Sequence, residues 1–279
     1  MLGKLFKFAG MLVVFGLIIG VISVAVLGTE KITEFIDKFN EDDLYEEMHF
    51  VAGEDAVNLE LQFVNRNVVV SRGDVETIEI HYFVSERDTI TVSENSGTVK
   101  MENRVRWQLF GAFRHVSSEI RRIEVVLPVN LLVGVDIKTT NGNMLLEELD
   151  NVQGIKLQTT NGNVTLRHIS IVDDLMIQTT NGLLNVQYVA ADKMNLKTTN
   201  GSITVNKAES NHITLKSTNG GITVDVRGVF EEYRIDVKST NGRIRYEDYT
   251  LGSGLIHPNA TNILNVQTTN GGIRLSFSE

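Results

Sequence analysis

A four-residue motif recurs along the second half of the chain, as Thr-Thr-Asn-Gly in five places and as Ser-Thr-Asn-Gly in two. Successive copies are separated by 20, 20, 19, 19, 22 and 29 residues. A period near 20 residues is typical of proteins in which one structural unit stacks on the next. The motif asparagines are Asn141, Asn161, Asn181, Asn200, Asn219, Asn241 and Asn270.

Apolar and polar residues alternate on both sides of every motif. Before Asn181, for example, Leu175 and Ile177 are apolar, and after it Leu184 and Val186 are apolar. Alternation with a period of two is typical of a strand that buries one face. Each repeat is therefore predicted to be a strand, a turn and a second strand.

Two arrangements of these strands satisfy the pattern. Asn-Gly favours a type I′ hairpin turn, which needs a positive φ at both central residues and would give a row of hairpins in a sheet or barrel. Alternatively, the motif is a corner of a β-solenoid, where identical residues form ladders from coil to coil. Only stacking explains the threonines, because the first one falls on the inward phase and its hydroxyl can bond its neighbour in the ladder.

The predicted fold class is therefore all-β: a single-stranded, β-helix-like β-solenoid with repeats of about 20 residues, preceded by one transmembrane helix. The asparagines are interpreted as a structural ladder rather than as a ligand site. A catalytic motif normally occurs once, whereas a motif present in seven copies is expected to have a structural role. We expect four segments: an anchor over residues 1–28, a juxtamembrane helix or linker over 29–49, a β-rich part with degenerate repeats over 50–132, and the regular solenoid over 133–279.

The anchor is predicted from an uncharged run over residues 8–29, which is long enough to cross a bilayer. Lys4 and Lys7 precede the run and Glu30 follows it, so the positive-inside rule places the N-terminus in the cytoplasm and the body outside the membrane. The predicted location is the cell membrane, with a single span. A cleaved signal peptide is the alternative.

Charge and residue content exclude several function classes. The part after residue 28 holds 24 basic and 35 acidic residues, a net charge of −11, which argues against nucleic acid as a partner. Cysteine is absent, and the six histidines form no HxH or HExxH pattern. We therefore predict no metal site, no cofactor and no catalytic residues.

Three regions depart from the regular pattern and are candidate interaction surfaces. An aromatic and basic stretch interrupts the acidic body, and its alternative is a long hairpin whose aromatic residues pack on the sheet. An insertion at residues 247–260 lengthens the last repeat step, and its alternative is a tolerated surface loop. The final coil, residues 272–279, has no evident cap and is a candidate for self-association. The residues of the first region are Arg104, Arg106, Trp107, Phe110, Phe113 and Arg114.

A further candidate is a stripe of lysines near the motif, interrupted by glutamines, which could bind an anionic wall polymer. Its alternative is a solvated face that prevents edge pairing. The stripe comprises Lys138, Lys156, Lys197, Lys216 and Lys238, with Gln158, Gln178 and Gln267.

The apolar N-terminal segment, the β-rich lead-in, the strand end Leu127-Pro128 and the serial Thr-Asn-Gly turns resemble the bacterial "putative adhesin" family of cell-envelope β-solenoids, including its membrane-anchored, LiaG-like members. The resemblance implies a non-enzymatic protein that acts by interaction in adhesion, scaffolding or envelope stress. Its expected partners are the membrane and an envelope protein or wall polymer. The alternative is a β-helix protein that binds or acts on cell-wall polysaccharide.

Overall fold

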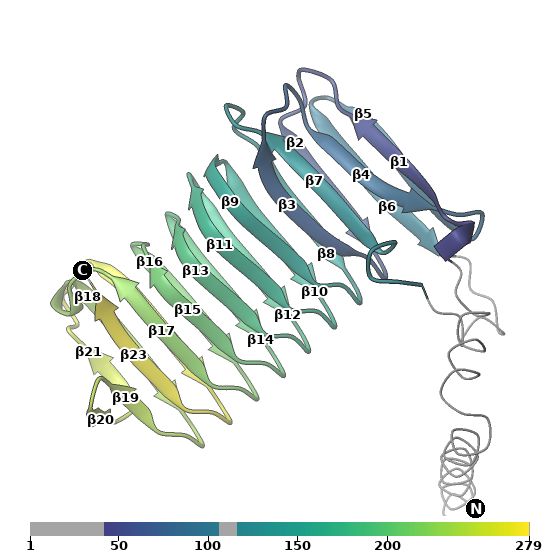
Figure 1. Cartoon of the computed structure of the whole chain (residues 1–279). Coiled ribbons are helices and arrows are strands. Elements are labelled where there is room, and N and C mark those ends of the chain that lie inside the picture. The colour runs from purple at the N-terminus through teal and green to yellow at the C-terminus, as the bar shows by residue number, and fades with distance from the viewer. Residues whose placement is uncertain (1–41, 106–115, 279) are drawn as a thin grey trace, which may run out of the picture. The chain divides into compact units, whose positions relative to one another are not determined.

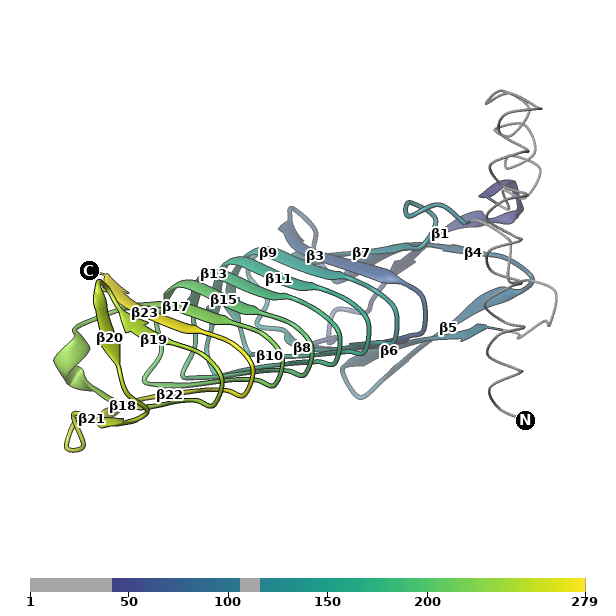
Figure 2. The same cartoon turned by 90° about the horizontal axis from the view of Figure 1, so that it is seen from below.

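The computed structural model describes residues 42–105 and 116–278. Most of the predicted anchor and juxtamembrane segment lies outside these residues, and the part that is described contains no helix both long and apolar enough to span a membrane. The short 3₁₀ helix η1 (Asp42–Leu44) belongs to a different compact unit from the strands that follow it. The strands form one unit, in which they stack as rungs in two layers (Figures 1 and 2).

Two sheets make up these layers within the described residues, with 12 and 11 strands. The first sheet runs in the order β1 (Glu46–Val51), β4 (Glu79–Val84), β7 (Arg122–Pro128), β3 (Asn67–Gly73), β9 (Met144–Val152), β11 (Val164–Ile171), β13 (Leu184–Ala190), β15 (Ile203–Ala208), β17 (Ile222–Arg227), β23 (Ile273–Ser278), β19 (Ile244–Tyr246) and β20 (Tyr249–Leu251). The second runs in the order β21 (Gly254–Ile256), β18 (Tyr233–Ser239), β22 (Asn262–Thr268), β16 (His212–Ser217), β14 (Lys193–Thr198), β12 (Asp174–Thr179), β10 (Gly154–Thr159), β8 (Gly134–Thr139), β2 (Asn58–Phe63), β6 (Thr98–Val105) and β5 (Asp88–Asn95).

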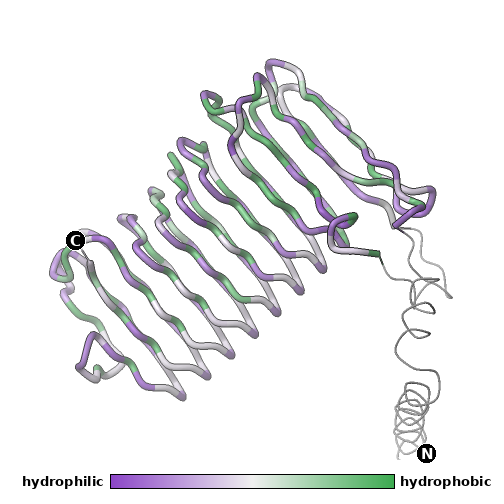
Figure 3. The backbone as a smooth tube through the Cα atoms, viewed as in Figure 1, coloured by the Kyte–Doolittle hydropathy of each residue, from purple (hydrophilic) through white to green (hydrophobic). Residues whose placement is uncertain are grey.

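Each regular coil contributes one strand to each sheet, and equivalent residues of neighbouring coils pair in parallel. Leu157 of β10, for example, lies beside Ile137 of β8 and Ile177 of β12, and all three are fully buried. The alternating apolar residues of both sheets meet in one continuous core. Figure 3 shows this alternation along the strands.

The motif turns are solenoid corners rather than hairpins. No residue of the seven motifs has a positive φ, whereas a type I′ turn requires two in succession. The strands on the two sides of a motif also lie in different sheets, as β12 and β13 do around Asn181. The stacked arrangement predicted from the repeat is therefore the one observed.

The chain does not fill the coils in sequence order at its C-terminal end. After β17 and the short helix η2 (Phe230–Glu232), it skips one coil position and forms β18 and β19, and it then returns to fill the skipped position with β22 and β23. The last strand, β23, pairs with β17 on one side and with β19 on the other, as the yellow strand in Figure 1 shows. The prediction that residues 272–279 form an open final coil is therefore wrong, because both edges of β23 are already paired.

Antiparallel strands close both ends of the stack. At one end, β20 pairs with β19 and β21 pairs with β18, so the 247–260 insertion forms a cap instead of a loop. At the other end, β5 pairs with β6, β4 pairs with β7 and β1 pairs with β4. Caps of this kind shield sheet edges from pairing with other chains.

The N-terminal boundary of the sheet differs from the prediction. Strand β1 begins at Glu46, so residues 46–49 belong to a strand and not to the helix or linker expected over residues 29–49. Residues 46–49 are extended because each pairs with a residue of β4. The β-rich part over residues 50–132 supplies two further coils, β2 with β3 and β6 with β7, together with the cap strands.

Candidate functional site

The motif asparagines form an unbroken hydrogen-bonded ladder along one corner of the stack. The side-chain amide of Asn181 donates to Oδ1 of Asn161 at 2.7 Å, and Asn200 donates to Asn181 at the same distance. The ladder follows spatial order, so Asn270 donates to Asn219 and Asn241 donates to Asn270. The seven predicted ladder residues therefore do lie together.

The sequence reading missed one member of this ladder. Asn141 donates to Oδ1 of Asn65 at 2.7 Å, so the corner after β2 is built like the motif corners. Asn65 is followed by Arg66 and preceded by Phe63-Val64, so the motif is not recognisable there. Alignment of Asn65 on the strand alternation, rather than on Thr-Thr-Asn-Gly, would have found it.

The first threonine of each Thr-Thr-Asn-Gly motif is buried, as predicted, but its bond differs from the expectation. Thr179 is buried, and its hydroxyl donates to the carbonyl oxygen of Gly162 in the preceding coil at 3.3 Å. Equivalent bonds join Thr159 to Gly142 and Thr198 to Gly182. The hydroxyls therefore satisfy buried backbone carbonyls instead of bonding one another.

The motif glycines permit close stacking rather than an unusual φ. A Cβ on Gly182 would lie 1.8 Å from the carbonyl oxygen of Gly162, and a Cβ on Gly162 would lie 1.8 Å from that of Gly142. No side chain fits such a gap. The motif corner is thus fully explained by stacking, and its outer residues are left to face solvent.

Those outer residues form a strip without acidic residues, which we call the motif strip. Each of its seven segments is six residues long: the two residues before a Thr-Asn-Gly, these three residues, and the one that follows. Each segment begins with an exposed or half-buried Lys or Gln. The second threonine and the asparagine of every segment are exposed. The segments are residues 138–143, 158–163, 178–183, 197–202, 216–221, 267–272 and 238–243.

The motif strip concentrates positive charge in an otherwise acidic protein. It carries Lys138, Lys197, Lys216, Lys238 and Arg243, whereas the whole chain has a net charge of −9. Lys197 and Lys216 are register partners on neighbouring strands. Within the described residues, neither forms an ion pair with a carboxylate. Adjacent like charges on a sheet repel one another, and a bound anion would relieve the repulsion between these two lysines.

Two parts of the predicted lysine stripe need correction. Lys156 does not lie in the row of Lys138, because it sits two residues earlier and pairs with Met176 and Asp136. Its Nζ lies 2.6 Å from a carboxylate oxygen of Asp136, so its charge is already neutralised. Arg243, which the sequence reading did not include, belongs to the motif strip.

A shallow groove lies on the outer face of the second sheet, around the strand ends away from the motif corner. It is lined by both signs of charge, including Asp136, Lys156, Asp174 and Lys193. Lys193 lies 3.8 Å from carboxylate oxygens of both Asp174 and Asp192. Because these charges are paired with one another, the groove offers a weaker attraction for an ion than the strip does.

The aromatic and basic stretch is not placed by the structure. Arg106, Trp107, Phe110, Phe113 and Arg114 lie outside the described residues, and of Arg104 only the backbone is described, in β6 opposite Thr89. The interaction predicted for this stretch stays a prediction.

Comparison with known proteins gives a family for most of the chain. A profile of the Toastrack DUF4097 family matches residues 57–279. No curated protein matches the sequence.

Several solved structures are similar at low identity. A "putative adhesin" from Bacteroides fragilis is 14% identical with a TM-score of 0.47, over 85% of this chain and 99% of that one. A "putative adhesin" from Parabacteroides merdae is 11% identical with a TM-score of 0.44, over 86% and 98%. A "putative cell adhesion protein" from Clostridium sporogenes is 14% identical with a TM-score of 0.38, over 84% and 100%.

Proposed function

The chain belongs to the Toastrack DUF4097 family, and from this premise we propose that it is a non-enzymatic, membrane-anchored protein of the bacterial cell envelope. The apolar run over residues 8–29 is the proposed anchor, with the N-terminus in the cytoplasm and the solenoid outside. The solenoid acts by interaction, in adhesion, scaffolding or the response to envelope stress.

We further propose that the ligand is an anionic wall polymer that lies along the motif strip. The observation that carries this proposal is the absence of acidic residues from all seven strip segments of an acidic chain, together with the five cations found there. Seven coils spaced by about 4.8 Å extend over about 30 Å, which suits a linear polymer better than a small molecule.

The strip also offers neutral hydrogen-bonding groups at the same repeat. Each exposed threonine has a hydroxyl, and each ladder asparagine uses only one of its two amide hydrogens to reach its neighbour. A polymer with both anionic and hydroxyl groups matches this combination. The recognition we propose is therefore periodic, with one set of contacts per coil.

Charge reversal tests the proposal. The full-length protein in detergent is sedimented with cell-wall fragments that retain their phosphate polymers and with fragments from which these polymers have been removed. We expect binding only to the first, and at least a tenfold loss of binding for the double variant Lys197→Glu and Lys216→Glu, because two cations become two anions.

A matched control lies on the opposite sheet. Arg167 on β11 and Arg227 on β17 are both exposed, and they lie four and six residues beyond the strip segments of their coils. The double variant Arg167→Glu and Arg227→Glu makes the same change in net charge away from the strip, and we expect it to bind normally. Equal loss in both double variants would show general charge attraction instead of a strip. Equal binding to both kinds of fragment would favour a neutral wall polysaccharide as the ligand.

A further inference from the structure

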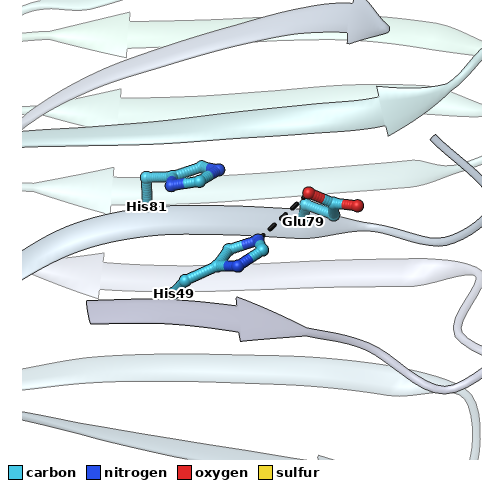
Figure 4. A group of neighbouring side chains, drawn as sticks. All are labelled: His49, Glu79 and His81. Atoms are coloured by element: carbon cyan, nitrogen blue, oxygen red, sulfur yellow. Dashed lines mark hydrogen bonds and ion pairs between the residues drawn. The ribbon is translucent and has the colours of Figure 1, made fainter. Parts of the chain in front are cut away.

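Two histidines and a glutamate meet on the outer face of the N-terminal cap. His49 lies on β1 and is the register partner of His81 on the antiparallel strand β4. Glu79 lies two residues before His81 on the same strand, so strand alternation places both side chains on one face. Figure 4 shows the three side chains on this face.

The three side chains already have the proximity of a metal site. Nε2 of His49 lies 3.0 Å from Oε2 of Glu79. One ligand atom from each residue can be chosen so that all three lie within 4.8 Å of one another. The two imidazole rings stack at a centroid distance of 4.2 Å and an interplanar angle of 11°.

We propose that His49, Glu79 and His81 bind one divalent transition-metal ion, of which Zn²⁺ is the physiological example to test. Two imidazoles and one carboxylate are a ligand set that zinc prefers, at bond lengths of about 2.0–2.2 Å. Tetrahedral geometry with such bonds separates ligand atoms by about 3.4 Å. Metal binding therefore requires rotation of the exposed His49 side chain and the half-buried His81 side chain to bring the nitrogens to that separation.

Solvent supplies the remaining ligand. The His49 side chain is 44% exposed, so the cluster is open on its outer side. Glu124 of β7 is the register partner of His81, but its carboxylate is engaged by Arg122 at 3.1 Å. The chain thus provides three ligands and leaves a position for water or for a group of a partner.

The bound ion would stabilise the pairing of the edge strand β1 with the rest of the sheet. Strand β1 has no buried residue and pairs with β4 alone, so its docking depends on few contacts. A metal held by His49 on β1 and by Glu79 and His81 on β4 joins the two strands directly. The ion therefore stabilises the strand through which the chain enters the solenoid.

Calorimetric titration tests the binding itself. The full-length protein in detergent is stripped with a chelator, exchanged into a non-chelating buffer and titrated with zinc chloride. We expect one equivalent to bind, with at least a tenfold loss of affinity for His49→Ala and for His81→Ala. His168→Ala, which removes a histidine outside the cluster, is the matched control and should bind as the unmodified protein does.

Amide hydrogen exchange tests the effect on β1 independently of the titration. Zinc at 100 times its Kd should slow exchange of the β1 amides by about 100-fold, because only the docked strand binds the ion. Exchange in β12 should not change. The proposal is overturned if one equivalent does not bind, or if both alanine variants bind as tightly as the unmodified protein while their circular dichroism shows an intact fold. It is likewise overturned if zinc binds without slowing exchange in β1.

Discussion

The two corners of each coil solve the same problem of stacking in different ways. At the motif corner, neighbouring coils use identical residues, and glycine carbonyls lie where a Cβ would clash at 1.8 Å. The opposite corner is a bend within the first-sheet strands, where Glu148, His168, Tyr188 and Lys207 lie above one another in four successive coils, and each has a left-handed φ between 52° and 54°. One corner is fixed by residue identity and the other by backbone conformation.

The difference follows from what lies next to each corner. The glycine of the motif faces the backbone of the preceding coil, so no other residue fits there. The left-handed residues of the opposite corner point outward and are exposed or half-buried, so their identity is free and their side chains only stack, as the rings of His168 and Tyr188 do at 4.8 Å. Substitutions at the two corners should therefore change the free energy of unfolding by different amounts, and even in opposite directions.

The largest effect is expected for Gly182→Ala. Its Cβ would meet the backbone of Gly162, which is itself held between two coils, so the stack must open locally. We expect a loss of at least about 3 kcal/mol in the free energy of unfolding. Denaturant titration of the full-length protein in detergent measures it. The control is Gly252→Ala in the C-terminal cap region, where no atom lies within 4 Å of the new Cβ. A similarly small loss at both positions would show that the corner can relax.

The ladder residue should matter less than the glycine. Asn181→Ala removes two hydrogen bonds of 2.7 Å, one to Asn161 and one from Asn200. At about 0.5–1.5 kcal/mol for each bond, the expected cost is about 1–3 kcal/mol. Thermal unfolding measures it. An unchanged melting temperature would mean that water replaces the ladder at this exposed corner without loss.

The buried threonine should matter less again. Thr179→Val keeps the shape but removes the hydroxyl that donates to the Gly162 carbonyl at 3.3 Å, a long hydrogen bond. We expect a loss of about 1 kcal/mol, because that buried carbonyl loses a donor. Thr180→Val, at the exposed threonine beside it, should change stability by less than about 0.5 kcal/mol. Equal losses at the two positions would assign the effect to β propensity instead of the bond.

The sequence predicts the motif corner well because its constraint is local and repeated. Strand alternation identifies the core, and the period identifies the ladder. The exception is Arg66, which is completely buried and occupies the position of the motif glycine in the first coil of the ladder. Its guanidinium donates to the carbonyls of Ile120 and Phe83 and pairs with Asp88 at 2.7 Å.

The sequence does not predict the order of the last coils or the histidine cluster. Strands β22 and β23 lie between two coils that come before them in the sequence. This position depends on contacts between residues 51 positions apart in the sequence, as between Asn270 and Asn219. His49 and His81 meet only because β1 runs antiparallel to β4 in one particular register. Neither leaves a periodic signal, because both depend on pairing of strands that differ in sequence.

The smallest expected effect concerns the left-handed corner, and it differs in sign from one site to another. At Lys207, glycine should be more stable than alanine by about 0.5–1 kcal/mol, because relief of the left-handed backbone exceeds the extra entropy of unfolded glycine. Both variants lose the Lys207 ammonium, which lies 5.9 Å from the Tyr188 ring, so this loss does not contribute to the difference between them. At Lys216, in the regular strand β16, the order should reverse, with alanine the more stable by a similar amount. Denaturant midpoints of the four variants measure both differences, and the same order at both sites would show that the left-handed row stores no strain.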